Sequence, residues 1–134
     1  MIIDNTLIDE LFAKAEASER KRMNHDLRTS EEDGCQRMLN AMLPGTIVPI
    51  HRHPNSNENV VLIKGRMDDV LYEEVMTPDG RTFKEVCRYP LDLANGNYGC
   101  VIPANVWHTV EIIEPSVIYE AKDGRFGHDG SERV

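Results

Sequence analysis

The chain has 134 residues, of which 40% are hydrophobic and 28% are charged, and its formal net charge at pH 7 is −8. A chain of this length can bury one hydrophobic core, so we expect a single domain over residues 1–134. The acidic balance argues against a nucleic-acid-binding protein, which needs a basic face to neutralise phosphates. The longest aliphatic run, residues 60–63, is too short to cross a bilayer. The first residues lack the basic region and apolar stretch of a signal peptide, so we expect a cytoplasmic protein with neither a nucleic-acid nor a membrane partner.

The first segment predicts an α-helix over about residues 5–17. Polar residues at positions 4–6 can cap the free N–H groups at its start. Leu7, Leu11 and Ala15 recur at a spacing of four residues and form one apolar stripe. We expect this stripe to pack against the rest of the fold and to carry no chemistry.

From about residue 36 to residue 122 the sequence changes to short segments of alternating or β-branched residues separated by turn signals. Strands at this spacing, with no second helical pattern between them, predict an all-β sandwich or barrel. Asp79-Gly80 is the clearest hairpin turn, between strands at 70–76 and 81–88. We expect the glycine-rich tail, residues 123–134, to be partly disordered.

Three cysteines, Cys35, Cys87 and Cys100, are widely spaced and form no CxxC pair. An odd, scattered set in a chain without a secretion signal predicts reduced thiols. We expect each of them to pack as a small hydrophobic side chain.

Two histidines, His51 and His53, are separated by one residue. On a strand, residues i and i+2 point to the same face, so both imidazoles would project together. Glu58 follows a turn-prone segment at 54–57, and a hairpin there would bring its carboxylate back beside the two rings. Two nitrogen ligands and one oxygen ligand suit a borderline divalent metal.

His108 is the best candidate for a fourth ligand from a distant strand. It shares one strand face with Val106, Val110 and Ile112, and a lone polar group on an apolar inward face needs a partner. Each of the four residues also has a simpler interpretation when taken alone. The histidine pair could be exposed on a turn, Glu58 could be a surface charge, and His108 could be a hydrogen-bonded core residue. The remaining histidines, His25 and His128, are isolated, and we treat them as non-ligands.

The spacing of these residues resembles the first motif of the cupin superfamily. Five residues of this chain, two of them the glycines that bound the motif, occupy its defined positions: Gly45, His51, His53, Glu58 and Gly65. The resemblance implies a cupin fold, which is a jelly-roll or double-stranded β-helix barrel, here preceded by an α-helix. It also implies that the two histidines and the glutamate are metal ligands.

The second cupin motif is only partly present. Pro103 and His108 fit it, but Asn105 replaces the turn glycine and Ile112 replaces the final asparagine. Asparagine tolerates positive φ better than most residues, so the turn can survive. The fourth ligand is retained.

Within the cupins, residues 22–25, 36–41 and 44–54 resemble the WbuC family of cupin-fold metalloproteins. Members of that family occur in bacterial surface-polysaccharide gene clusters, which implies a link to sugar metabolism without assigning a reaction. Cupins are often dimers, so the resemblance also allows a homodimer.

A site of three histidines and one glutamate leaves open positions on one divalent ion, which could be Fe, Mn, Ni, Co or Zn. We expect a small-molecule enzyme of the isomerase, lyase or Fe(II) dioxygenase type, with its ligand bound in the barrel. The alternative is a non-catalytic module that binds or senses a metal or small molecule. A closed structural metal site and a metal-free sugar-nucleotide epimerase fit less well. No residue is assigned a catalytic role.

Five polar residues could contact the substrate at the mouth of the barrel, although surface or core positions explain each of them equally well. Arginine would suit a carboxylate or phosphate group. The five are Arg22, Asn24, Arg37, Asn40 and Tyr119.

Overall fold

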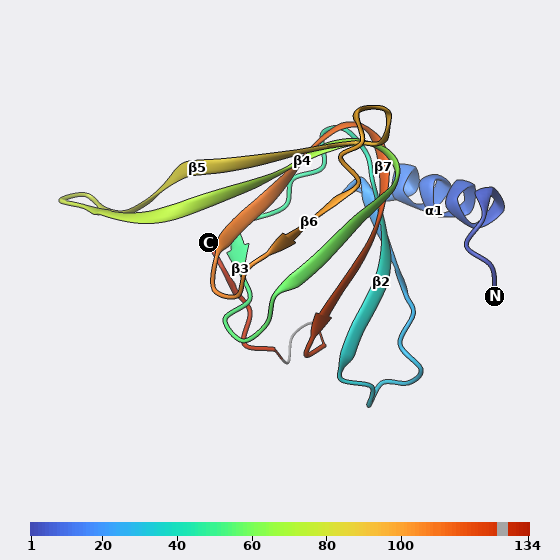
Figure 1. Cartoon of the computed structure of the whole chain (residues 1–134), viewed down its shortest axis with the longest axis horizontal. Helices are drawn as coiled ribbons and strands as arrows, with labels where there is room; N and C mark the ends of the chain where they lie inside the picture. The colour runs from blue at the N-terminus through green and yellow to red at the C-terminus, as the bar shows by residue number, and fades with distance from the viewer. Residues whose placement is uncertain (126–128) are drawn as a thin grey trace.

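The computed structural model describes residues 1–125 and 129–134, and it consists of one helix and a strongly curled sheet (Figure 1). The helix α1 spans Asn5–Ala17, and a short 3₁₀ turn spans Leu93–Asn95. The strands are β1 Arg22–Asp26, β2 Cys35–Met42, β3 His51–Arg52, β4 Glu58–Thr77, β5 Gly80–Asp92, β6 Gly99–Ile102, β7 Trp107–Asp123 and β8 Glu132–Arg133. The predicted all-β architecture with an N-terminal helix is confirmed.

The two longest strands, β4 and β7, form the centre of the sheet. They pair antiparallel from Glu58↔Lys122 to Tyr72↔Trp107. The C-terminal half of β7 also pairs with β2, which pairs with β1, whereas its N-terminal end pairs with β3 at His108↔His51. Strands β5 and β6 both add to β4. The sheet therefore curls around an interior to which β1, β2, β3, β4 and β7 all contribute.

A glycine in β4 allows the sharp bend of the central strand pair. Gly65 has φ +96°, and a Cβ atom built on it would lie 2.3 Å from the carbonyl oxygen of Pro115. The register of β4 against β7 shifts on both sides of this position. Only glycine allows the two backbones to approach so closely with this dihedral angle, which explains the second glycine of the motif.

The hydrophobic side chains form two separate cores. One lies between α1 and the outer face of the sheet, where Ile8, Leu11 and Ala15 pack against Leu39 and Val117. The other lies inside the barrel and consists of buried residues from β2, β4, β5 and β7: Met42, Val60, Leu62, Met67, Leu91 and Ile118. The predicted apolar stripe of the helix thus has a packing role. The helix begins after Asp4, whose side chain accepts a hydrogen bond from the N–H of Leu7.

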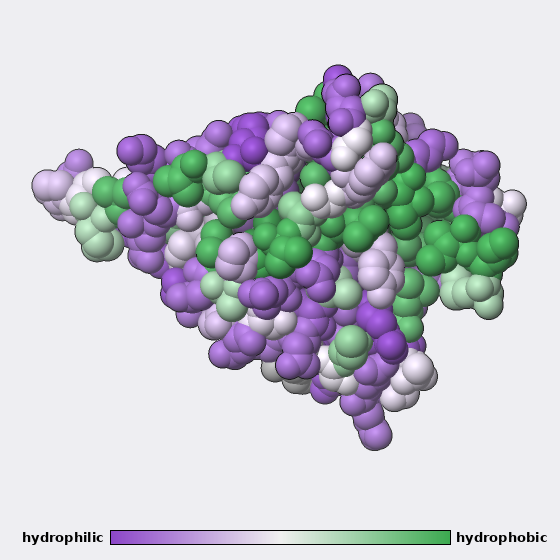
Figure 2. Space-filling view, viewed as in Figure 1, coloured by the Kyte–Doolittle hydropathy of each residue, from purple (hydrophilic) through white to green (hydrophobic). Residues whose placement is uncertain are grey.

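The hairpin formed by β4 and β5 extends beyond the barrel as a two-stranded arm, seen at the left of Figure 1. Past Tyr72, β4 pairs only with β5, over residues 73–77 and 80–84. The predicted turn at Asp79-Gly80 is confirmed, and the strands on both sides are longer than expected. In Figure 2, apolar side chains gather over the middle of the visible face, between the arm and α1. The homodimer that the cupin resemblance allows stays a prediction.

The end of the C-terminal segment adds a short strand to the sheet, and partial disorder of the tail stays a prediction. Strand β8 pairs with β3, and the N–H of Val134 donates to the carbonyl oxygen of Ile50 at 2.9 Å. Residues 126–128, including His128, lie outside the described residues. The three cysteines are free thiols. The helices of the described ranges include none with the length and apolar character that a bilayer crossing requires.

Candidate metal centre

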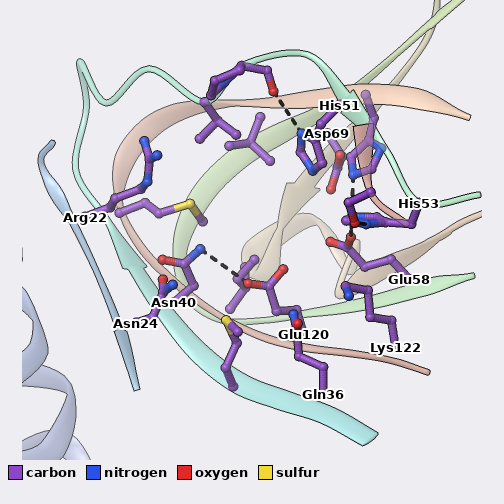
Figure 3. A pocket seen from close by; sticks show the side chains of 18 of the residues that line it. Arg22, Asn24, Gln36, Asn40, His51, His53, Glu58, Asp69, Glu120 and Lys122 are labelled. Carbon is purple, nitrogen blue, oxygen red and sulfur yellow. Dashed lines mark hydrogen bonds and ion pairs between the residues drawn. The ribbon is translucent and has the colours of Figure 1, made fainter. Parts of the chain in front are cut away.

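The four predicted ligands come together from three strands at one end of the barrel interior (Figure 3). His51 lies on β3, His53 directly follows it, Glu58 begins β4, and His108 is the second residue of β7. One possible ligand atom from each residue lies within 4.8 Å of the other three. Atoms bound to a common ion at about 2.1 Å are at most about 4.2 Å apart, so a small contraction would bring all four into coordination distance.

Hydrogen bonds fix the tautomer of each imidazole. Nδ1–H of His51 donates to the carbonyl oxygen of Pro49 at 2.8 Å, and Nδ1–H of His108 donates to that of Val106 at 3.1 Å. His53 Nδ1 lies 2.7 Å from Ser131 Oγ, whose own hydrogen is directed at Asp129, so His53 is the donor here as well. With Nδ1 protonated, each neutral ring directs the lone pair of Nε2 away from its backbone or side-chain acceptor.

The Nε2 atoms of two of the histidines lie close to the carboxylate of Glu58. His53 Nε2 and His108 Nε2 are buried without a hydrogen-bond partner among the described residues. They lie 2.7 Å and 3.6 Å, respectively, from Oε2 of Glu58. Lone pairs facing a buried carboxylate repel one another unless a cation lies between them. The donor set therefore fits a divalent metal ion, bound by three imidazole nitrogens and one carboxylate oxygen.

The charge states of these groups also suit metal binding. Burial, and to a smaller extent the nearby His108, lowers the pKa of His51 to about 4, so His51 is neutral at pH 7. Burial opposes ionisation of Glu58, but the adjacent His108 and His53 hold its pKa well below the usual value. Burial lowers the pKa of His108, but the carboxylate of Glu58 more than offsets this. Because a metal ion binds the neutral imidazole, metal binding at this site should weaken as the pH falls.

A buried ion pair supports His53 from behind. Asp129 Oδ2 lies 3.2 Å from His53 Nδ1 and accepts a hydrogen bond from the ammonium group of Lys122. Ser131 completes this network through its hydrogen bonds to Asp129 and His53. Carboxylate and hydroxyl acceptors of this kind orient histidine ligands and raise their basicity. The C-terminal segment thus contributes to the site, although the sequence analysis gave it no role.

The residues next to the ligands on the outer side of the strands form an aromatic stack. The guanidinium carbon of Arg52 lies 4.4 Å from the ring centroid of Trp107, and Phe83 of the arm packs edge-on against the same ring at 5.1 Å. Arg52 also pairs with Glu132 of β8 at 2.7 Å. These contacts join the strands that carry His51, His53 and His108.

The candidate ligands lie in a cavity of about 420 Å³. Alternation along the strands determines its lining, because successive side chains point to opposite faces. From β1 and β2, even-numbered residues face the cavity: Arg22, Asn24, Gln36, Met38, Asn40 and Met42. From β7 and β4 it receives Val110, Ile118, Glu120, Lys122 and Asp69. Each of these two groups of strands therefore contributes both polar and apolar side chains to the cavity.

Three of the five predicted substrate residues, Arg22, Asn24 and Asn40, line this cavity. The other two do not, and the prediction for them is corrected. Arg37 lies on the opposite face of β2 and pairs with Asp33 at 2.5 Å. Tyr119 packs against the core beneath α1. Both residues have odd numbers on strands whose even-numbered residues face inward.

Asp69 is the most notable cavity residue that the sequence analysis missed. Its side chain is 1% exposed, and Oδ1 has no hydrogen-bond partner among the described residues. Burial raises its pKa to about 7. In the sequence Asp69 is the second of two adjacent aspartates, directly before the apolar Val70 and Leu71, and this pattern does not show that its side chain is buried.

Comparison with models of protein families assigns the chain to one family. A model of a domain of unknown function, DUF6016, matches residues 3–81, which is more than half of the sequence. The chain belongs to the DUF6016 family. No curated protein matches it.

Several solved structures share the fold of this DUF6016 protein, and one of them is described as a cupin-2 domain. An oxalate oxidase in complex with glycolate has a TM-score of 0.59 at 16% identity, over 98% of this chain and 65% of that chain. A cupin-2 domain from Rhodospirillum rubrum has a TM-score of 0.55 at 18% identity, over 86% and 66%. Oxalate decarboxylase from Bacillus subtilis has a TM-score of 0.54 at 21% identity, over 84% and 27%. This chain corresponds to only part of the length of such proteins, since in another oxalate oxidase structure the match covers 57% of that chain. The predicted cupin barrel is confirmed, and the histidine–glutamate cluster within it suggests a metal-binding cupin.

Proposed function

We propose that this protein is a metal-dependent enzyme for a small molecule that binds in the barrel. In this proposal His51, His53, Glu58 and His108 hold one divalent ion. The observation that carries the proposal is the convergence of three imidazole rings and one carboxylate beside a cavity of about 420 Å³. The Nε2 atoms of His53 and His108 have no hydrogen-bond partner among the described residues.

The cavity supports catalysis more than structural metal binding. Structural zinc sites are usually closed and have four protein ligands, often cysteines. Here the cluster adjoins a space large enough for a small organic ligand. A divalent ion would supply Lewis-acid polarisation of a carbonyl or hydroxyl group, or a bound water of lowered pKa. The protein would supply the binding walls, including Asn40 and Gln36, and would exclude bulk water.

The finer predictions from the sequence belong to this proposal. An isomerase or lyase needs only the polarising effect of the ion, whereas a dioxygenase needs Fe(II) and O₂. The resemblance to the WbuC family favours a sugar-derived substrate and a bacterial protein. These details rest on the resemblance alone.

Metal content tests the site directly. Elemental analysis of untagged wild-type protein should find about one equivalent of a divalent metal. The variants His51→Ala and His108→Ala should lose it, because each removes one imidazole ligand. His25→Ala is the matched control, since His25 lies on β1 outside the cluster and should leave the metal in place. A wild-type protein that binds no metal even after reconstitution would contradict the proposal.

Activity requires a separate experiment. The metal-loaded protein is incubated with carbonyl and hydroxyl compounds, and with Fe(II) under O₂, while product formation and oxygen uptake are followed. We expect turnover in the wild type and none in His108→Ala. Tight binding of a small molecule with no chemical change would instead favour the non-catalytic binding module.

A further inference from the structure

Two of the arginines that line the cavity, Arg20 and Arg22, differ from most other arginines of the chain. The protein has ten arginines. Seven lie within 4.0 Å of a carboxylate oxygen: Arg28, Arg37, Arg52, Arg66, Arg81, Arg88 and Arg125. The three that line the cavity are Arg20, Arg22 and Arg133. Within the described parts of the chain, the side chains of Arg20 and Arg22 make no ion pair with a carboxylate, although acidic residues outnumber basic ones by 23 to 15.

The guanidinium of Arg22 is held in place by neutral groups. Nη1 donates to the carbonyl oxygen of Ile47 at 2.7 Å and to Oγ1 of Thr46 at 3.4 Å. The hydroxyl of Thr46 in turn donates to the carbonyl oxygen of Arg20 at 2.6 Å. The loop before β3 therefore positions Arg22 without neutralising its charge, and Figure 3 shows this side chain across the cavity from Glu58 and His53. A fixed and partly buried guanidinium is well suited to bind an oxyanion.

The three arginines lie close enough to affect one another. Burial lowers the pKa of Arg22, and the charges of Arg20 and Arg133 lower it further. The like charges of Arg20 and Arg22 at the edge of the cavity repel each other, and an anion bound between them would relieve this repulsion. The described carboxyl groups of the cavity do not provide this anion, because none of them forms an ion pair with Arg20 or Arg22.

The wall between these arginines and the candidate metal ligands offers hydrogen-bond acceptors. Asn40 Oδ1 and Gln36 Oε1 are buried and have no hydrogen-bond partner among the described residues. Gln36 is only 5% exposed. Unpartnered buried amide oxygens are unfavourable unless a ligand donates to them, as a hydroxyl group would.

We propose that the cavity binds a small hydroxylated organic anion, with its carboxylate or phosphate group on Arg20 and Arg22. Its hydroxyl groups donate to the amide oxygens of Asn40 and Gln36, and an oxygen at its other end faces the histidine–glutamate cluster. The position of that last oxygen rests on the proposed function. The arginine contacts do not depend on it.

The test uses three-carbon probes that differ in charge: glycerol 3-phosphate and glycerate as anions, and glycerol as the neutral control. Isothermal titration calorimetry measures their binding to the wild type and to Arg20→Gln, Arg22→Gln and Arg66→Gln. The last variant is the matched control, because Arg66 lies outside the cavity and pairs with Glu114. Arg20→Gln removes a side chain that makes no hydrogen bond among the described residues, so this variant should keep its fold even if Arg22→Gln does not.

We expect both anions to bind the wild type, with the dissociation constant raised about tenfold or more in Arg20→Gln and Arg22→Gln and unchanged in Arg66→Gln. Equal binding of the anions to wild type and both cavity variants would overturn the proposal. So would binding of glycerol as tight as that of the anions, or no anion binding at millimolar concentrations.

The same titrations on chelator-treated protein separate this proposal from the proposed function. If the wild type holds no metal, the metal-dependent function fails. Dependence of anion binding on Arg20 and Arg22 would still support the anion site in that case, and its absence would still overturn it.

Discussion

Asp69 combines almost complete burial with a free carboxyl oxygen and a pKa raised to about 7. The charged form of this group is disfavoured in the folded protein, since the unfolded value is near 3.8. The folded state therefore binds more protons than the unfolded state between about pH 4 and pH 7. Over this window the contribution of Asp69 to stability falls as the pH rises, by at most about 1.4 kcal/mol per pH unit.

Substitution of Asp69 by asparagine should remove this pH dependence, because an amide cannot lose the proton. We expect the stability of Asp69→Asn relative to wild type to increase from pH 4 to pH 7 and then to level off. Urea denaturation of the chelator-treated proteins across this range measures the difference, and all other titrating groups are common to both. A difference that is independent of pH would show that Asp69 is ionised in the fold.

Gly65 should be intolerant of any side chain. A Cβ atom there would meet both the backbone of Pro115 and Ser116 Oγ at less than 2.5 Å, and φ is positive. We expect Gly65→Ala to lower the free energy of unfolding by at least about 2 kcal/mol. Gly34→Ala is the control, since nothing lies within 4 Å of its Cβ position, and it should change stability little. Similar denaturation midpoints for the two variants would contradict this reading of the bend.

Residue identity and local spacing predict the candidate ligands well, because His51, His53 and Glu58 are close in sequence and a turn brings them together. Asn105 also adopts φ +69°, as its replacement of a turn glycine suggested. The inward face of an individual strand is harder to predict. A shift of one residue exchanges the two faces, which is why Tyr119 was assigned to the cavity and Glu120 was overlooked.

At the scale of elements, the pairing of β8 with β3 places the C-terminal segment behind His53. We expect Ser131→Ala to weaken metal binding about tenfold, because it removes the acceptor for Nδ1–H of His53 and one support of Asp129. Competition with a metal-binding dye measures the affinity. The control is Ser30→Ala, which lies in an exposed loop between β1 and β2 and should bind metal as the wild type does. Equal affinities for both variants would show that the ring of His53 needs no support from this segment.

The elements with strong local signals were predictable, and those defined by tertiary contacts were not. The helix has its own cap and apolar stripe, and the β4–β5 hairpin has an Asp-Gly turn. Strands β3 and β8 have two residues each, so their pairing carries no pattern that a sequence window can detect. Their positions depend on pairing with strands that are distant in sequence, since β3 pairs with β7 and with β8.

For the whole molecule, the candidate metal site links β3, β4 and β7, and so closes one end of the barrel. A metal that binds only the folded state adds about 2.7 kcal/mol of stability at a concentration one hundred times its dissociation constant. We therefore expect chelation to lower the melting temperature of the wild type and to leave that of His108→Ala unchanged. Calorimetry with and without chelator measures both. An equal response of the two proteins would mean that the chelator acts elsewhere.

Trp107 is the only tryptophan of the chain, and it is 4% exposed. Its neighbour along β7 is His108, Arg52 of the ligand-bearing segment stacks on its ring, and Phe83 touches it from the arm. The intrinsic fluorescence of the protein therefore originates at one point, beside the cluster and at the root of the arm. Assembly of the site, loading with different ions and movement of the arm can each be followed by the intensity and wavelength of this emission, with no label attached.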